Sequence, residues 1–328
     1  MIRCFMILTE KQILDLSFGS VKKFVKDGLV HFQKCTDKQV SAWYKIRQDL
    51  GGRAEATTGV KLDFVTDGDK LVFSFIKGRK VEVYIDNLFR GQFLMDEYRA
   101  KNAKVEIPIT DTLGKPYGEA RVTVYFPAHD EPGVIDYFEV SNATFVKPHK
   151  HDIKFLFIGD SITQGWETMT DTLSYAQKTT RFFNAESVIN GVGGAIFAEE
   201  TFDSIDFAPD VVILAYGTND FGYWKSADEM LSHIKGYMSL VAKEYAGKKL
   251  FAISPVWRRD YDRICDTGTF PEARDRVISV AKELGFTHID GLKMIPPIAD
   301  YFTDNVHPNE LGFAFYSDNL IAELKKYL

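Results

Sequence analysis

The periodicity of hydrophobic residues changes near residue 148, and this change constrains the fold more than any other feature of the sequence. Before it, short segments alternate apolar with polar residues and are rich in β-branched and aromatic side chains, which is typical of strands. Asp86–Asn87 is predicted to turn the chain between two of them as a hairpin. Closely spaced strands without a long helical pattern between them predict an antiparallel β-sandwich or jelly roll over residues 1–148. The predicted strands are 60–68, 71–78, 81–85, 105–109 and 120–127.

After about residue 150, apolar runs alternate with helix-like segments. The runs are IKFLFIG, SVING, DVVILAYG, KLFAISPVW and FTHID, and the helical patterns cover 226–245, 270–284 and 310–328. Alternating strands and helices predict a mostly parallel sheet with helices on both faces, an α/β/α domain over residues 149–328. Sites in such sheets form at the carboxyl ends of the strands, where loops meet.

The cysteines and histidines do not follow a metal-binding or disulfide pattern. Cys4, Cys35 and Cys265 are odd in number and far apart, which suits a reducing compartment. The seven histidines show no HExxH spacing. His149 and His151 fit a solvated linker ahead of the second domain. The sequence therefore predicts neither a metal ion nor another cofactor.

Charge and hydrophobicity exclude several classes of partner. The formal net charge is −6, so the chain lacks the basic character that binds nucleic acid or an anionic membrane surface. Its N-terminus, MIRCFMILTEKQ, has an apolar run too short for a signal-peptide core. No stretch approaches the roughly 20 apolar residues of a membrane span. We therefore expect a cytoplasmic protein.

Four loops at the predicted strand ends and before the last helix carry polar or glycine residues. Ser161 follows the first strand of the α/β region, and GVGG, ending at Gly194, follows the second. The third strand leads into GTND, which contains Asn219. Asp304 precedes His307 by three residues in TDNVHPNELG. If the sheet is parallel, these groups meet at one edge.

Together these residues supply what acyl transfer to water needs. A serine hydroxyl becomes a nucleophile when a base such as His307 takes its proton, and Asp304 could hold the imidazole in the required tautomer. A tetrahedral oxyanion needs preorganised donors, each lowering the barrier by roughly 2.7–4 kcal/mol. The candidate donors are the amides of Ser161 and Gly194 and the side chain of Asn219.

Each of these residues also has a purely structural interpretation. Ser161 could be a turn or cap residue, the GVGG segment a tight turn, Asn219 an Asx-turn residue and Asp304 a helix N-cap. The catalytic interpretation is favoured because all four loops occur together, in order, at the same end of one sheet.

The same segments resemble the SGNH hydrolases, also called GDSL esterases and lipases, over residues 150–328. GDSIT, GVGG, GTND and DNVHP resemble the first, second, third and fifth blocks of that family. The resemblance implies that Ser161 is the nucleophile, His307 the base and Asp304 its orienting acid. It also implies an oxyanion hole made by Ser161, Gly194 and Asn219. The glycine block is compressed, which favours Gly194 over Gly193.

A β-sandwich ahead of an SGNH domain is similar to the arrangement in carbohydrate esterase family 2. SPVWRRD (254–260) also resembles a segment of such two-domain esterases, which implies that Trp257 and Arg258 lie near the acyl or sugar site. Trp257 could equally be a core residue. Arg53 could reach the site, but nothing in the sequence fixes its position.

The predicted function is that of a serine esterase, a carboxylic ester hydrolase acting through an acyl-enzyme. It would remove short acyl groups, acetyl above all, from hydroxyl groups of a carbohydrate, so that its substrate is a small-molecule or oligosaccharide ester. A lysophospholipase or acyl-CoA thioesterase is the alternative among enzymes. A non-catalytic carbohydrate-binding protein is the alternative of another class. The oligomeric state is left open.

Overall fold

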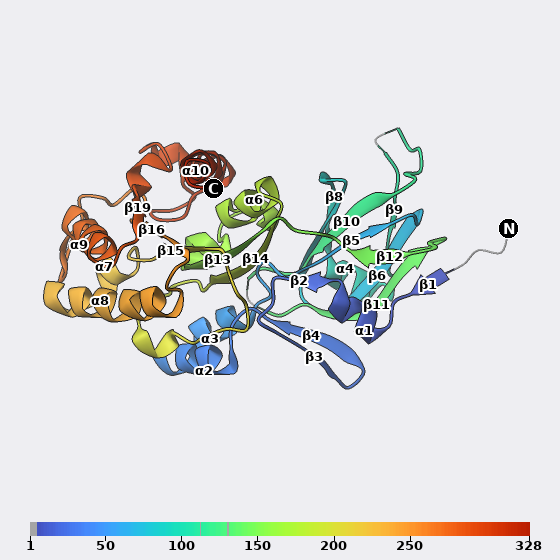
Figure 1. Cartoon of the computed structure of the whole chain (residues 1–328), viewed down its shortest axis with the longest axis horizontal. Coiled ribbons are helices and arrows are strands. Elements are labelled where there is room, and N and C mark those ends of the chain that lie inside the picture. Colours follow the sequence, from blue (N-terminus) through green and yellow to red (C-terminus); the bar gives the residue numbers. More distant parts are fainter. Residues whose placement is uncertain (1–4, 112, 130) are drawn as a thin grey trace. The chain divides into compact units, whose positions relative to one another are not determined.

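The computed structural model describes residues 5–111, 113–129 and 131–328, which form two compact units (Figure 1). The first unit contains the residues up to Cys35 together with Glu55–His151, and the second contains Thr36–Ala54 together with Asp152–Leu328. The expected division between residues 148 and 149 places 36–54 in the first domain. The contacts within the chain assign this segment to the second unit instead.

Two antiparallel sheets form the described part of the first unit, which confirms the predicted β-sandwich class. The first sheet has the order β3 (Lys22–Lys26), β4 (Leu29–Gln33), β11 (Val134–Ser141), β6 (Lys70–Lys77) and β9 (Val105–Pro108), with β1 (Phe5–Ile7) beside β11. The second has the order β12 (Val146–Pro148), β5 (Lys61–Thr66), β10 (Ala120–Tyr125), β7 (Lys80–Ile85) and β8 (Leu88–Leu94), with β2 (Ser17–Phe18) beside β5. Helices α1 (Glu10–Asp15) and α4 (Met95–Ala100) belong to the same unit.

Alternating residues of these strands build the sandwich core. Phe73 and Phe138 stack with ring centroids 6.0 Å apart, and both are buried. The hairpin predicted at Asp86–Asn87 is confirmed, since both residues have positive φ, 48° and 61°, and connect β7 to β8. Positive φ at both central positions is what a two-residue hairpin turn requires.

The interpretation of His151 as part of a solvated linker is wrong. Its side chain is 5% exposed, and its Nε2 atom lies 3.0 Å from Oδ2 of the buried Asp63. The stretch after β12 therefore packs on the face of β5 that carries Asp63, opposite the face whose Leu62 and Phe64 belong to the apolar core. The residues next to His151 in the sequence are polar or charged and do not indicate that its side chain is buried. Its partner Asp63 lies on a strand that is distant in the sequence.

Four helices lie in the region in which only strands are expected, and two of them, α2 (Asp37–Ile46) and α3 (Gln48–Glu55), follow one another between β4 and β5. Thr36 caps α2 in a capping box with Gln39, a spacing that favours a helix start. Trp43 of α2 is 1% exposed. The segment is thus a short helical insertion that packs with the second unit rather than a connection within the sandwich.

The second unit is built on a parallel sheet, which confirms the predicted α/β class. Its order is β14 (Ala185–Gly191), β13 (Ile153–Gly159), β15 (Val211–Ala215), β16 (Lys249–Ile253) and β19 (Thr287–Ile289). Figure 1 shows two of its helices on one face of the sheet, α6 (Tyr175–Phe182) and α10 (Glu310–Leu324), and two on the other, α8 (Ala227–Glu244) and α9 (Phe270–Glu283). The shorter elements are α5 (Ser161–Gln164), α7 (Asp220–Tyr223), the hairpin β17 (Ile264–Cys265) and β18 (Gly268–Thr269), and the 3₁₀ turns η1 (Asp171–Leu173), η2 (Glu199–Thr201), η3 (Gly291–Lys293) and η4 (Ala299–Tyr301).

Strand order places the polar loops together. Gly159, the last residue of β13, pairs with Gly191 of β14 on one side and with Ala215 of β15 on the other. The chain leaves β13 toward β14 and reaches β15 on the opposite side, so the strand order reverses here. A parallel sheet opens a crevice for ligands at such a point.

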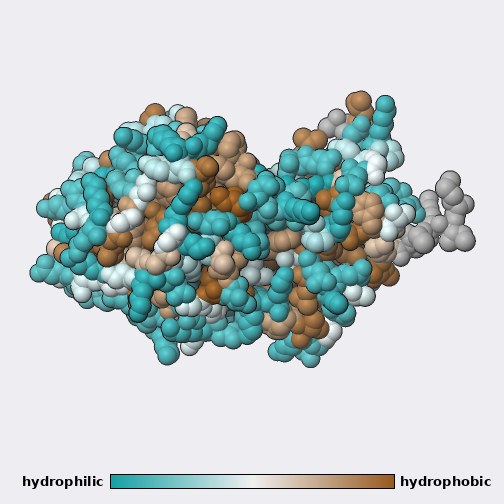
Figure 2. Space-filling model, in the orientation of Figure 1, coloured by the Kyte–Doolittle hydropathy of each residue, from teal (hydrophilic) through white to brown (hydrophobic). Residues whose placement is uncertain are grey.

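The face drawn in Figure 2 carries exposed hydrophobic side chains. Figure 2 shows them interspersed with hydrophilic residues across the visible face. Leu113, Met169 and Ile264 are examples that are 82%, 74% and 75% exposed. Within the described ranges, no helix is both long and apolar enough to cross a membrane.

Candidate active site

Ser161 stands at the start of α5, directly after β13. The cap of this helix is Asp160, whose Oδ1 accepts a hydrogen bond of 2.9 Å from the Ile162 amide. The helix ends at Gly165, which has a left-handed φ of 89°. Because Asp160 performs the capping, the Ser161 hydroxyl is available for another partner.

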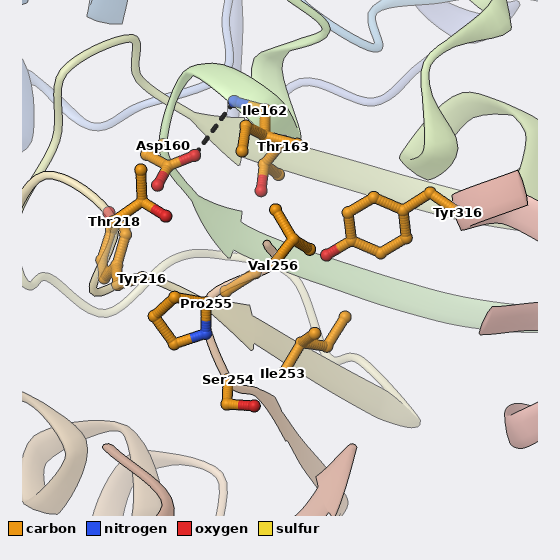
Figure 3. A pocket seen from close by; sticks show the side chains of 11 residues that line it. Asp160, Ile162, Thr163, Tyr216, Thr218, Ile253, Ser254, Pro255, Val256 and Tyr316 are labelled. Carbon is orange, nitrogen blue, oxygen red and sulfur yellow. Dashed lines mark hydrogen bonds between the residues drawn. The ribbon is translucent and has the colours of Figure 1, made fainter. Parts of the chain in front are cut away.

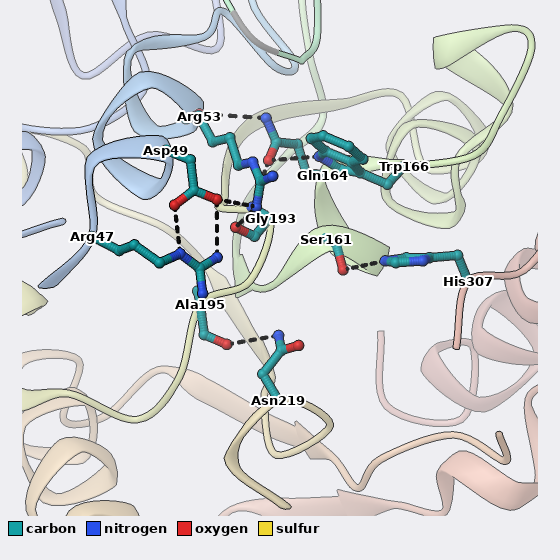
Figure 4. A network of polar contacts seen from close by, with 10 residues as sticks. All are labelled: Arg47, Asp49, Arg53, Ser161, Gln164, Trp166, Gly193, Ala195, Asn219 and His307. Carbon is teal, nitrogen blue, oxygen red and sulfur yellow. Dashed lines mark hydrogen bonds and ion pairs between the residues drawn. The ribbon is translucent and has the colours of Figure 1, made fainter. Parts of the chain in front are cut away.

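That partner is His307 (Figure 4). Ser161 Oγ lies 2.8 Å from His307 Nε2, and His307 Nδ1 lies 2.7 Å from Asp304 Oδ2. The other carboxylate oxygen of Asp304 accepts from the amides of Val306 and His307 at 2.6 and 2.7 Å. These bonds fix the imidazole between an acceptor and a hydroxyl. The structure brings together the three side chains that the sequence predicts as the triad.

The carboxyl group of Asp304 is held in its ionised form. Partial burial raises its pKa, but the hydrogen bonds from the His307 side chain and from the amides of His307 and Val306 outweigh burial and lower it. The N-cap of the following helix α10 is Asn309, so Asp304 is not the cap that its sequence position also allowed. An ionised acceptor on Nδ1 favours the tautomer whose Nε2 can take a proton.

The predicted oxyanion donors lie on three neighbouring loops. The Ser161 amide is at the first position of α5, where a helix N–H has no partner within the helix. Gly194 has φ of +85°, a conformation that strains other residues. Asn219 Nδ2 donates one hydrogen bond of 2.9 Å to the Ala195 carbonyl, which leaves its second N–H for another acceptor.

Two carboxyl groups are buried behind the Ser161 turn. Burial raises the pKa of Asp160 to about 7 and that of Asp220 to about 6.

Asp160 and Thr218 border a cavity of about 20 Å³, seen in Figure 3, whose lining also includes Tyr316. This volume suits a single water molecule and is far too small for an ester substrate.

Arg258 faces the protein interior. It is 7% exposed, donates from Nε and Nη2 to the two carboxylate oxygens of Asp260 at 2.5 and 3.0 Å, and donates from Nη1 to the Thr218 carbonyl at 3.0 Å. These bonds tie it to the loop that carries Asn219. Trp257 is partly buried and packs edge-on against Phe302, with ring centroids 5.2 Å apart.

A polar cluster lies beside the glycine loop and was not predicted from the sequence. The sequence indicated only that one of its members, Arg53, could reach the site. Arg53 Nη1 donates to the Gly193 carbonyl at 2.9 Å, and the Gly193 amide donates to Gln164 Oε1 at 2.6 Å. The Arg53 guanidinium also lies 4.6 Å from the ring centre of Trp166 (Figure 4). The sequence signal for this cluster is that Gln164 and Trp166 closely follow Ser161 in the chain.

The described residues contain no group of three or more His, Cys, Asp and Glu side chains that could hold a metal ion. Burial raises the pKa of the Cys35 thiol to about 11, so this thiol is protonated and inert. Cys265 is partly exposed. Cys4 lies outside the described residues.

Solved structures with the same fold cover almost the whole chain. A salicylyl acyltransferase from a tetracycline biosynthetic pathway superposes with a TM-score of 0.80 at 15% identity, covering 98% of this chain and 97% of that one. A putative GDSL-like lipase from Bacteroides ovatus gives 0.71 at 15% identity, covering 99% and 97%. An acetyl xylan esterase from the rumen bacterium Butyrivibrio proteoclasticus gives 0.65 at 13% identity, covering 99% and 98%. No curated protein matches significantly in sequence.

The family comparison covers the part of the chain that holds the loops described above. Residues 157–315 match the GDSL-like lipase/acylhydrolase family, and they include Ser161, Gly194, Asn219, Asp304 and His307. This match confirms the predicted superfamily and the predicted class of enzyme, a carboxylic ester hydrolase. Residues 157–315 of this chain therefore form a GDSL-like lipase/acylhydrolase domain, and the protein is an acyl hydrolase.

Proposed function

We propose that the chain is a serine esterase that removes short acyl groups, chiefly acetyl, from hydroxyl groups of a sugar or oligosaccharide. The observation that carries the proposal is the continuous hydrogen-bonded series from Asp304 through His307 to Ser161, with separations of 2.7 and 2.8 Å. Both distances are within the reach that proton transfer requires.

The reaction would proceed through an acyl-enzyme. His307 Nε2 takes the proton of the Ser161 hydroxyl while Oγ forms a bond to the ester carbonyl carbon. The tetrahedral intermediate then expels the alcohol oxygen, which receives the proton from His307. Water repeats the sequence, with His307 again as base, and releases the acid and free Ser161. Asp304 remains ionised and stabilises the imidazolium that forms at each step.

Three donors would stabilise the oxyanion: the amides of Ser161 and Gly194 and the Asn219 side chain. The bond from Asn219 to the Ala195 carbonyl supports this role, because it orients the carboxamide without using its second N–H. The Ser161 amide is supported by its place at the start of α5.

The proposed substrate class is supported by two observations. The fold is shared along the whole chain with a family two carbohydrate esterase from Cellvibrio japonicus, at a TM-score of 0.65. Trp166 and Trp257 are both partly exposed, and the part of each ring that Arg53 or Phe302 leaves uncovered is available to the apolar face of a sugar. We propose both as platforms for the substrate. The contacts of Arg258 are internal, and we propose that it supports the loop of Asn219 in addition to lying near the substrate, as predicted.

The test compares p-nitrophenyl acetate, p-nitrophenyl octanoate and an acetylated xylo-oligosaccharide as substrates of the full chain. Ser161→Ala is expected to lower turnover by at least about 10⁴-fold, because no other hydroxyl replaces the nucleophile. Ser232→Ala, at an exposed position of α8, is the matched control and should be as active as wild type. Acetate release from the oligosaccharide that requires Ser161 supports the proposal.

Other outcomes point to other functions. A preference for octanoate without glycan deacetylation keeps the nucleophile and favours a lysophospholipase or thioesterase. Acetyl transfer to an added alcohol in place of water would instead favour an acyltransferase, which the salicylyl acyltransferase of the same fold illustrates. Glycan binding that survives Ser161→Ala, with no turnover by wild type, would favour a carbohydrate-binding protein and overturn the proposal.

A further inference from the structure

The peptide group between Gly193 and Gly194 joins two functions in one rigid plane. The Gly193 carbonyl and the Gly194 N–H belong to the same planar unit, so the direction of one fixes the direction of the other. Gly194 N–H is a proposed donor to the oxyanion. A side chain that fixes the Gly193 carbonyl therefore also fixes the direction of the Gly194 N–H.

The group that holds the carbonyl is Arg53 of α3, which is 140 residues distant in the sequence and belongs to the same compact unit. Its Nη1 atom donates to the Gly193 carbonyl oxygen at 2.9 Å. On the other side of the same residue, the Gly193 amide donates to Gln164 Oε1 at 2.6 Å. The peptide groups before and after Gly193 are thus each fixed by a side chain (Figure 4).

Arg53 is itself held in place. Its Nη1 atom forms an ion pair of 3.1 Å with Asp49 Oδ2, and its guanidinium stacks on Trp166. The Trp166 indole N–H donates to Gln164 Oε1 at 3.2 Å, and the side-chain amide of Gln164 donates to the Arg53 carbonyl at 3.4 Å. The Arg53 side chain is only 23% exposed, which keeps these charge-assisted bonds poorly screened by solvent.

The positively charged guanidinium that donates to the Gly193 carbonyl oxygen also affects the Gly194 N–H, because both belong to one peptide group. A carbonyl that accepts a charge-assisted hydrogen bond is polarised, and the N–H of the same peptide group becomes a stronger donor. Neighbouring side chains leave no space for a side chain at Gly193. A Cβ atom there would lie 2.8 Å from the Trp166 indole nitrogen and 3.2 Å from Arg53 Cδ. The peptide therefore has little freedom to turn while Arg53 is in place.

We propose that Arg53 is a positioning residue of the oxyanion hole, which orients and polarises the Gly193–Gly194 peptide so that Gly194 N–H stabilises the tetrahedral intermediate. The inference rests on the proposed ester hydrolysis at Ser161. It gives the α2–α3 insertion a direct part in the chemistry of the second unit.

One test observes this peptide without any need for activity. The sequence contains only two Gly–Gly peptides, Gly51–Gly52 and Gly193–Gly194. Full-length protein labelled with 1-¹³C,¹⁵N-glycine therefore gives two HNCO signals, and Gly52→Ala identifies the one from Gly194. Arg53→Ala should move the Gly193 carbonyl ¹³C signal upfield and shift the Gly194 amide. Arg181→Ala is the matched control, because Arg181 Nη2 donates to a different carbonyl, that of Thr172, at 2.7 Å.

A kinetic test on p-nitrophenyl acetate measures the consequence for the transition state. Arg53→Ala should lower kcat and kcat/KM alike, by about 10- to 100-fold, with KM unchanged, because the donor is weakened rather than removed. Arg53→Lys should restore part of the rate, since an ammonium group can still donate to the Gly193 carbonyl. Arg181→Ala should match wild type.

The outcomes separate the inference from the proposed function. An unchanged Gly194 signal in Arg53→Ala overturns the inference even when Ser161-dependent hydrolysis is intact. A shifted signal with wild-type kcat also overturns it, because the contact then has no effect on the transition state. Absence of Ser161-dependent hydrolysis in wild type overturns the proposed function, and with it the oxyanion role of Arg53, whatever the signal does.

Discussion

Each unit contains an aspartate–histidine pair, and the two pairs have similar geometry in very different surroundings. In the sandwich unit His151 Nε2 lies 3.0 Å from Asp63 Oδ2, and in the α/β unit His307 Nδ1 lies 2.7 Å from Asp304 Oδ2. The side chains of Asp63 and His151 are 0% and 5% exposed, whereas those of Asp304 and His307 are 50% and 21% exposed. An aspartate–histidine hydrogen bond by itself therefore does not identify a reactive site.

The other partners of the buried pair make it structural. Asp63 Oδ2 also lies 2.9 Å from Lys61 Nζ, and Arg121 donates to both carboxylate oxygens at 2.8 and 2.7 Å. Burial raises the pKa of Asp63, but Lys61, Arg121 and His151 together hold it well below its usual range. Burial lowers the pKa of His151, so its imidazole is neutral near pH 7. A buried carboxylate with two permanent cations is stable and has no proton to exchange.

The exposed pair differs in its third partner. The second ring nitrogen of His307 contacts a hydroxyl, Ser161 Oγ, rather than a charged group. This imidazole can take a proton from one side while Asp304 stabilises the resulting charge on the other. The third group and the access of solvent therefore decide whether an aspartate–histidine pair is structural or chemically active.

The largest expected effect tests the two histidines against each other. His307→Ala should lower turnover of p-nitrophenyl acetate by about 10⁴- to 10⁶-fold while leaving the urea midpoint nearly unchanged, because the residue is on a partly exposed loop. His151→Ala should do the reverse, with near wild-type turnover and a loss of about 1–3 kcal/mol of unfolding free energy from a buried hydrogen bond. Retained activity in His307→Ala would end the distinction between the pairs.

The two aspartates give the next largest effects. Asp304→Asn is expected to lower kcat by up to about 10⁴-fold, less than loss of the base, because neighbouring carbonyls can partly orient the imidazole. Asp63→Asn should leave kcat of the folded protein unchanged and lower the unfolding free energy by about 3–5 kcal/mol, since it removes the buried negative charge that Lys61 and Arg121 share. Stopped assays and urea titrations on the same preparations measure both quantities. A wild-type urea midpoint in Asp63→Asn would contradict the structural role.

The smallest effect concerns the dependence of stability on pH. The folded-state pKa of Asp160 is raised to about 7 by burial, so its contribution to stability is complete below about pH 4 and is lost as the pH rises through 7. Asp63 has a lowered pKa, so its contribution is present above about pH 4 and is lost on acidification. Wild type should thus lose about 1 kcal/mol between pH 6 and 8 through Asp160.

Asp160→Asn isolates this term, because asparagine caps a helix about as well as aspartate. In urea titrations between pH 6 and 8, the unfolding free energy of this variant should depend less on pH than that of wild type. Asp63→Asn should instead keep the wild-type slope in that range. Equal slopes in wild type and Asp160→Asn would show that the buried carboxyl does not titrate there.

Much of the α/β unit could be predicted from the sequence because its signals are local. The helical pattern over 226–245 corresponds to α8 at Ala227–Glu244, and the run IKFLFIG is β13. The missed elements include strands β3, β4 and β11 and helices α1 to α4 and α6. Helix α2 is short, and its apolar residues pack against distant segments that the local sequence does not reveal.

The sequence by itself determined the class of each unit, the loops that carry polar groups, and the pairing of Asp304 with His307, which are only three residues apart. These properties follow from side-chain periodicity and from short-range hydrogen bonding. Only the tertiary structure decided that Arg53 reaches the glycine loop, that Arg258 points inward and that His151 is buried beside Asp63. These positions depend on contacts between residues that are 40 to 140 places apart in the chain. Such contacts form only when whole elements pack together, and no local pattern encodes them.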